Sequence, residues 1–118
     1  MLLQPISFFP PPPPPRPILC MTSGELSLYA ELIQPVEGSQ QEPMLWVRPL
    51  LLVSSEDGMS HVEDLRQSSD LLWLARDFVP AYAEDILPLL DQLGSEDHSS
   101  DSLQVLQRFL QRAWKHHS

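Results

Sequence analysis

The hydrophobic pattern of the chain has one centre, the run 45–53, which contains a single charged residue among nine. Branched and aromatic residues dominate the run and turn-forming residues precede it, which indicates a β-strand rather than a helix. Strict alternation divides the run into two faces, Trp46, Arg48, Leu50 and Leu52 on one and Leu45, Val47, Pro49, Leu51 and Val53 on the other. Both faces are apolar, so we expect both to need cover, and Trp46 and Leu50 to be buried.

Further strands are predicted on both sides of this run. Over 26–33, apolar residues at even positions alternate with Ser27, Tyr29 and Glu31, the period of a strand with one wet face. The eleven-residue polar connection that follows suits an antiparallel pair joined by a loose loop. After the turn signal Asp57-Gly58, residues 59–65 are a candidate third strand.

Proline 49 constrains the central strand, because it has no N–H group to donate to a neighbouring strand. The strand is therefore predicted to be an edge at that point, or to be bulged there. An exposed apolar edge favours pairing with another chain.

The period becomes helical after Asp77. A stripe at spacings of three and four predicts a helix over 77–93, with Asp77 as N-cap and with a kink or break near Leu87 caused by Pro88. The apolar segment 71–74 is expected to dock beneath the sheet or to begin this helix. A last helix is predicted from Ser100 or Asp101. The predicted fold class is α+β, a small antiparallel sheet of two or three strands packed against two C-terminal helices.

Residues 1–20 differ in kind from the rest, since eight of the thirteen prolines lie there. They predict a disordered polyproline arm that is dispensable for folding, and the polar start Met21-Thr-Ser-Gly-Glu suggests that the true start is Met21. The arm matches patterns for EVH1 and SH3 ligands, but any proline run followed by arginine does so, and we do not expect it to be such a ligand. Residues 21–118 are predicted to be one domain, with an acidic linker over 94–100.

The formal charge of −9 and the pI near 4.6 favour basic partners or simply maintain solubility, and they disfavour binding to nucleic acid or anionic lipid. The single cysteine, Cys20, excludes an internal disulfide framework and a cysteine-based zinc site. A reducing cytoplasmic location is expected. No apolar run reaches the roughly 18 to 20 residues needed to span a bilayer.

Candidate chemistry is sparse. No histidine among His61, His98, His116 and His117 has a histidine three or four positions away. The adjacent carboxylates Glu63-Asp64 and Glu84-Asp85 do not share a helix face, and no glycine-rich phosphate loop is present. We therefore predict no catalytic, cofactor-binding or metal-binding residues, and no enzyme.

Four segments carry a family resemblance. In order they are Leu28-Tyr-Ala-Glu-Leu-Ile-Gln-Pro35, Leu45-Trp-Val-Arg-Pro-Leu-Leu-Leu52, Asp64-Leu-Arg-Gln-Ser-Ser-Asp-Leu-Leu-Trp73 and Ile86-Leu-Pro-Leu-Leu90. They resemble a group of small uncharacterised proteins predicted from cyanobacterial genomes, over residues 25–93. The resemblance implies no activity, fold or cofactor. It does imply that EVH1 and SH3 readers are absent, which supports a start at Met21.

The leading interpretation is a protein-interaction module: a small adaptor, an assembly factor or an accessory subunit. The alternatives are an acidic dedicated chaperone, which resembles type III secretion chaperones in size, acidity and α+β content, and a small hydrolase or metal enzyme. A protein partner or a second copy in a homodimer would cover the apolar strand and the basic end of the last helix. The predicted partner-binding residues are Trp114, Arg112, Lys115, Phe109, Leu45, Val47 and Leu51.

Overall fold

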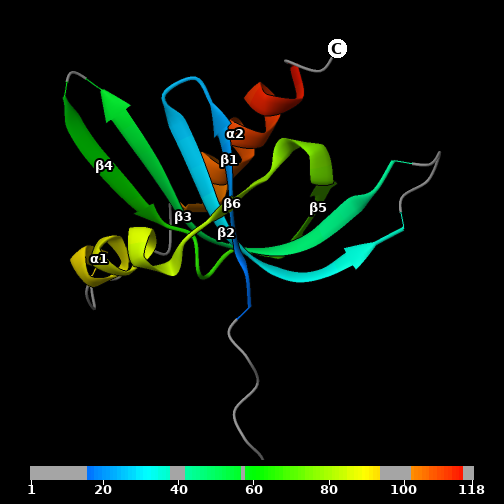
Figure 1. The fold of residues 1–118 in the computed structure, drawn as a ribbon. Coiled ribbons are helices and arrows are strands. Elements are labelled where there is room, and N and C mark those ends of the chain that lie inside the picture. Colours follow the sequence, from blue (N-terminus) through cyan, green and yellow to red (C-terminus); the bar gives the residue numbers. More distant parts are fainter. Residues whose placement is uncertain (1–15, 38–41, 57, 94–101, 116–118) are drawn as a thin grey trace, which may run out of the picture.

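The computed structural model describes residues 16–37, 42–56, 58–93 and 102–115. These form an antiparallel sheet with one helix on each face (Figure 1). In chain order the elements are β1 (Ile18–Ser23), β2 (Leu26–Val36), β3 (Met44–Glu56), β4 (Met59–Asp64), β5 (Leu71–Leu74), the 3-10 turn η2 (Ala75–Asp77), β6 (Val79–Ala81), α1 (Ala83–Leu93) and α2 (Ser102–Lys115).

The sheet has six strands, in the order β4-β3-β2-β1-β6, with β5 also paired to β3. The expectation of two or three strands was therefore wrong, although the candidate strand at 59–65 is confirmed as β4. Three strands, β1, β5 and β6, were not predicted, because each lies in a segment that was assigned another structure. β1 begins inside the segment assigned to the proline arm, β5 is only four residues long, and β6 lies inside the predicted helix.

The folded part begins before residue 21. Ile18, Leu19 and Cys20 lie in β1, and they supply every pairing that β1 makes with β6. Arg16 also belongs to the fold, because its Nη1 donates to the carbonyl of Ile33 at 3.0 Å. A chain starting at Met21 would lack half of β1 and leave β6 without its neighbour. The domain boundary therefore moves from residue 20 to residue 16, while residues 1–15 lie outside the described part.

β3 is an internal strand with a bulge. It pairs with β2 along its length, and on its other side with β5 over its first residues and with β4 over its last. The register with β2 jumps from Leu51 to Pro49, so Leu50 is the extra residue of the bulge. The bulge alternative for Pro49 is confirmed. The edge alternative also holds at that point among the described residues, because β5 pairs only with residues 44–47 and β4 only with residues 51–56.

The bulge reverses the alternation of side chains along β3. Val47 and Leu52, which strict alternation assigned to opposite faces, both belong to the main core cluster. Trp46 and Leu50, expected to be fully buried, are only half-buried. A one-residue slip moves every later side chain to the other face, which is why alternation failed in this strand.

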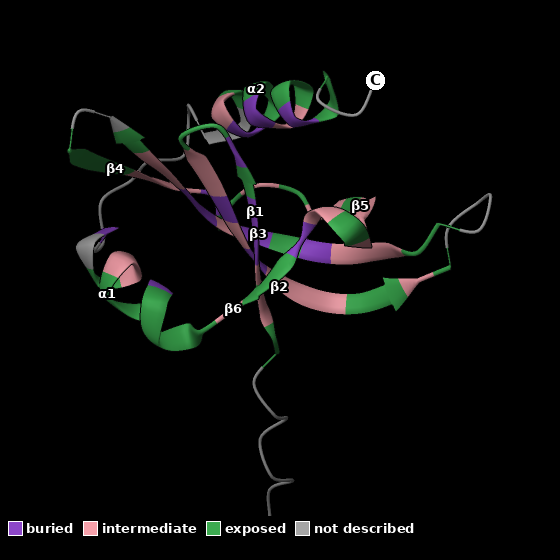
Figure 2. Ribbon diagram, turned by 45° about the horizontal axis from the view of Figure 1, so that its top comes forward, coloured by how far each residue is buried: buried purple, intermediate pink, exposed green. Residues whose placement is uncertain are grey.

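The main core lies between the sheet and α2. In β2, Leu28 and Ala30 are fully buried on this face, as the alternation predicted, and Leu106 and Phe109 of α2 pack against them. Figure 2 shows the buried side of α2 turned toward the sheet. We refer to this side of the sheet as the α2 face. Core burial of this kind stabilises by roughly 1.5 to 3 kcal/mol for each large apolar side chain.

The opposite side of the sheet, the α1 face, carries Cys20, Tyr29 and Leu51. Tyr29 alternates with the core residues of β2 and is the cross-strand neighbour of Cys20 and Leu51, so the three share a face. Figure 2 shows α1 on the other side of the sheet from α2. Leu51 is fully buried, and Ile86 of α1 is 3% exposed. The expectation that one face of the central strand would remain uncovered is corrected, because the two helices lie on opposite faces.

The first helix is shorter than predicted. Asp77 lies in a 3-10 turn, Pro80 lies in β6, and α1 begins only at Ala83. The helix continues through Pro88 without a break. Since Pro88 is the sixth residue of α1, its missing N–H removes a single hydrogen bond, the one to the carbonyl of Glu84.

Candidate interaction surface

Of the predicted partner-binding residues, three side chains lie in the interior. Val47 and Leu51 are fully buried in β3, and Phe109 is 1% exposed between α2 and the sheet. Leu45 is half-buried against the core. The exposed members are Arg112, Trp114 and Lys115, all on the last turn of α2.

The sequence of α2 explains this division. Leu106, Phe109 and Ala113 recur at spacings of three and four, and all three are buried against the sheet. Trp114 follows Ala113 and is therefore rotated by about 100° away from the buried stripe. Its side chain lies at the border of the helix face and is 57% exposed.

The Trp114 ring packs against the ring of Trp73. The two rings meet edge to face, with the ring centres 5.8 Å apart and the planes at 80°. Trp73 belongs to β5, and its Nε1 donates to Oδ2 of Asp77 at 2.6 Å. This hydrogen bond satisfies the indole N–H of a half-buried side chain and fixes the ring against which Trp114 leans.

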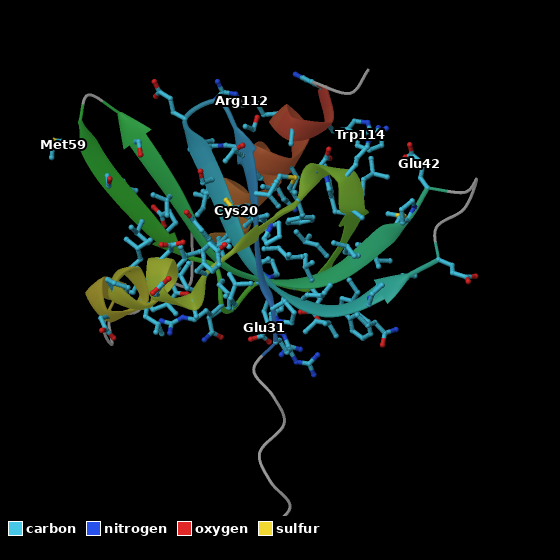
Figure 3. The ribbon with its side chains drawn as sticks, in the orientation of Figure 1. Cys20, Glu31, Glu42, Met59, Arg112 and Trp114 are labelled. Atoms are coloured by element: carbon cyan, nitrogen blue, oxygen red, sulfur yellow. The ribbon has the colours of Figure 1, made fainter. Side chains whose placement is uncertain are left out.

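The helix that carries Trp114 is basic. The helix α2 contains Arg108, Arg112 and Lys115 and no acidic residue, in a chain whose formal charge is −9. Arg112 reaches over the turn between β1 and β2, where its Nη2 lies 3.4 Å from the position of a Cβ on Gly24 (Figure 3). We define the Trp114 surface as Trp73, Arg112, Trp114 and Lys115.

The arginines of the sheet differ, because each has an acidic partner. The pairs are Arg16 with Glu31, Arg48 with Asp70, Arg66 with Asp64 and Arg76 with Glu42. In the described residues neither Arg108 nor Arg112 forms such a pair. Among the described arginines, the two without such a pair therefore both lie on α2.

Asp70 is the other polar centre on the sheet. Its carboxylate accepts bonds from Nε of Arg48 at 3.2 Å and from Nε1 of Trp46 at 3.0 Å. These bonds hold the pKa of Asp70 below its usual value. Because Asp70 directly precedes β5, it ties the start of that strand to β3.

Two further groups with shifted pKa values, Cys20 and Tyr29, lie on the α1 face. Burial raises the pKa of the Cys20 thiol and, with a smaller effect from the neighbouring Cys20, the pKa of the Tyr29 hydroxyl. Both groups therefore stay protonated near neutral pH. A protonated, buried thiol is a poor nucleophile.

The histidine and carboxylate candidates do not assemble into a metal site in the part of the chain that the structure describes. Nε2 of His61 lies 2.7 Å from Oε1 of Glu63 on the exposed strand β4. His98, His116 and His117 lie outside the described residues. Within the same ranges, no helix combines the length and the apolar composition that crossing a bilayer requires.

We compared the chain with family models, with curated proteins and with solved structures, and none of them matched. The surface is therefore interpreted from its own residues. Sequence patterns indicated Trp114 and its basic neighbours but missed Trp73 and Asp70. The hydrophobic periodicity of the neighbouring segments did not reveal that residues 71–74 form a strand that pairs with residues 44–47.

Proposed function

We propose that the protein is a non-enzymatic protein-interaction module, an adaptor, assembly factor or accessory subunit, that binds a protein partner through the Trp114 surface. The observation that carries the proposal is the exposed Trp114 ring held edge-on by Trp73. Tryptophan and arginine are enriched among the residues that dominate binding energies at interfaces.

The geometry favours binding because the aromatic ring is already positioned. Trp114 rests on Trp73, which is itself fixed by the hydrogen bond to Asp77. When a partner covers this ring, the Trp114 side chain loses little additional conformational freedom. Preorganisation of this kind raises affinity.

The charge of α2 indicates the chemistry of the partner. Three cations and no acid on α2 favour a partner surface that is acidic. The net charge of −9 disfavours the phosphate backbone of a nucleic acid, which would meet the acidic body as it approached.

The titratable groups support a binding role over catalysis. Cys20 and Tyr29 have raised pKa values through burial, and the lowered pKa of Asp70 follows from bonds that anchor β5. Each shift has a structural cause. A homodimer is not needed to cover an apolar face of the sheet, because the two helices lie on opposite faces. A separate partner is therefore the better proposal.

Photocrosslinking in cells of the native host tests the proposal. The full chain is produced with p-benzoylphenylalanine at Trp114 or, as a matched control, at Leu87, which is 56% exposed on α1. We expect irradiation to yield a discrete adduct from position 114 and none from position 87. Adducts of equal yield at both positions, or none at either, would remove the basis for the proposal.

A further inference from the structure

The outer edge of β5 presents backbone groups in a regular pattern. The N–H of Ala75 donates to the carbonyl of Pro43 at 3.1 Å, in line with the register that pairs Trp73 with Leu45. Hydrogen-bonded pairs alternate along an antiparallel ladder, so Leu71 and Trp73 bond to β3. The N–H and C=O groups of Leu72 and Leu74 then point away from β3.

No partner for these outward groups is found among the described residues. The backbone bonds outside the regular elements do not involve Leu72 or Leu74, and neither do the side-chain bonds. The Leu72 side chain is itself 57% exposed. A backbone edge in this state pairs readily with an added strand.

The other edge strands, β6 and β4, carry features that disfavour pairing with an added strand. β6 has three residues and contains Pro80, which has no N–H to offer. β4 ends in Glu63 and Asp64 and lies against α1. Charges and prolines are the usual means of blocking an edge, and β5, with the sequence Leu-Leu-Trp-Leu, has neither.

The side chains beside β5 differ between its two faces. Leu72 lies on the face of Trp46, with which it is paired, whereas Trp73 lies on the α2 face beneath Trp114. A strand added next to β5 would therefore place alternate residues beside an apolar surface and beside the basic end of α2.

We propose that an extended segment of the partner adds to the outer edge of β5 as a further strand, with apolar side chains on the Leu72 side and acidic side chains on the α2 side. This inference rests on the proposed function and specifies how the partner binds. The backbone bonds to Leu72 and Leu74 provide affinity, and the alternating side chains provide specificity.

Charge argues against a second copy as the added strand. Antiparallel pairing of β5 with β5 of another molecule requires a two-fold axis perpendicular to the sheet, which keeps both α2 helices on one face. The basic ends of the two helices would then meet at the junction, where like charges repel. An acidic segment has no such conflict.

The test uses the full chain and a fluorescein-labelled probe peptide, acetyl-Asp-Val-Glu-Ile-Asp-Val-Glu-amide, read by fluorescence anisotropy. Two further peptides are N-methylated at alternate residues, one at odd and one at even positions. Only one set of N–H groups faces β5 in an added strand. We expect one methylated peptide to bind at least about tenfold more weakly and the other to bind like the parent.

Two protein variants distinguish binding through the backbone of Leu72 from binding through its side chain. Leu72→Pro removes the outward N–H, and Leu72→Thr keeps it while removing the apolar side chain. We expect at least about a tenfold loss for the proline variant and less than about threefold for threonine. Far-ultraviolet circular dichroism confirms that both variants are folded.

Three results would overturn the inference. Equal binding of both methylated peptides would show that no strand is added. Absence of binding of the probe peptide up to about 1 mM would also overturn the inference. A dimer in sedimentation that Leu72→Pro abolishes would assign the edge to a second copy. In the first two cases a crosslink at position 114 still upholds the proposed function, whereas loss of that crosslink overturns the function itself.

Discussion

The two strands that pair with the same side of β3 are held in place in different ways. β4 continues from β3 through a tight turn at Gly58, whose φ is 78°, so chain connectivity alone brings it to its partner. β5 reaches the other half of β3 only after the connection 65–70. The comparison shows that β4 depends on a local turn and β5 depends on side-chain anchors.

The anchors of β5 lie at its two ends. Asp70 fixes the start through Trp46 and Arg48, and Trp73 fixes the end through Asp77 and through contact with the main core. Because side chains hold β5 from within the fold, its outer backbone edge stays available. The Trp114 surface and this edge therefore share one support, the ring of Trp73.

The largest effect is expected for Trp73→Ala, which removes the main anchor of β5. Loss of a buried tryptophan side chain costs about 3 to 5 kcal/mol, and we expect about 2 to 3 kcal/mol here because Trp73 is only half-buried. Urea unfolding measures the change, with Trp73→Phe as the control that keeps a ring and loses the hydrogen bond to Asp77. A cost for Trp73→Ala below about 0.5 kcal/mol would show that β5 needs no such anchor.

The matching change for β4 is Gly58→Ala. Nothing lies within 4 Å of a Cβ at this position, so the cost comes from the positive φ alone, about 1 to 2 kcal/mol. Gly24→Ala, with a φ of 61° in the turn between β1 and β2, is the control and should cost a similar amount. Urea unfolding of the two variants gives both numbers. A neutral Gly58→Ala would mean that the turn does not determine the position of β4.

The Asp70 anchor makes the stability of β5 depend on pH. Because the folded-state pKa of Asp70 lies below its ordinary value, Asp70 stabilises the fold above that ordinary value and loses the contribution as the pH falls through the folded-state pKa. Asp70→Asn should lower the free energy of unfolding at about pH 6 and flatten its decline toward about pH 3. Urea unfolding across this range is the measurement. An unchanged slope in the variant would exclude Asp70 as a titrating anchor.

The smallest effect is expected for Trp114→Ala. Its exposed ring contributes an edge-to-face contact with Trp73, a pair worth about 0.5 to 1.5 kcal/mol. We expect thermal unfolding to shift by only a few degrees. A cost comparable to that of Trp73→Ala would mean that Trp114 is a structural residue rather than a binding residue.

Much of the fold could be predicted wherever a single period persists. The alternation over 26–33 identified β2 and its core residues, and Trp114 at the basic end of the last helix was correctly placed on the surface. Prediction failed where a local exception changed the period. The bulge at Leu50 reversed the faces of β3. Val47 and Leu51 were proposed as partner contacts because one face of the strand was expected to lack a helix, and both are interior residues.

The candidate site was only partly predictable for a related reason. Arg112, Trp114 and Lys115 could be identified from their composition and their place at a helix end. The contribution of β5 could not, because a four-residue apolar segment fits a strand or a helix equally well. Only its long-range register with β3 places Trp73 beneath Trp114 and orients the backbone of Leu72 outward.

Residue-resolved amide hydrogen exchange of the isolated full chain tests the central claim most directly, namely that β5 is anchored on one side and open on the other. We predict slow exchange at Leu71 and Trp73 and fast exchange at Leu72 and Leu74, with the same alternation in β4, where Glu63 should be slow and Val62 fast. Protection of Leu72 and Leu74 equal to that of Trp73 would contradict the account, because the outer edge of β5 would then already be covered.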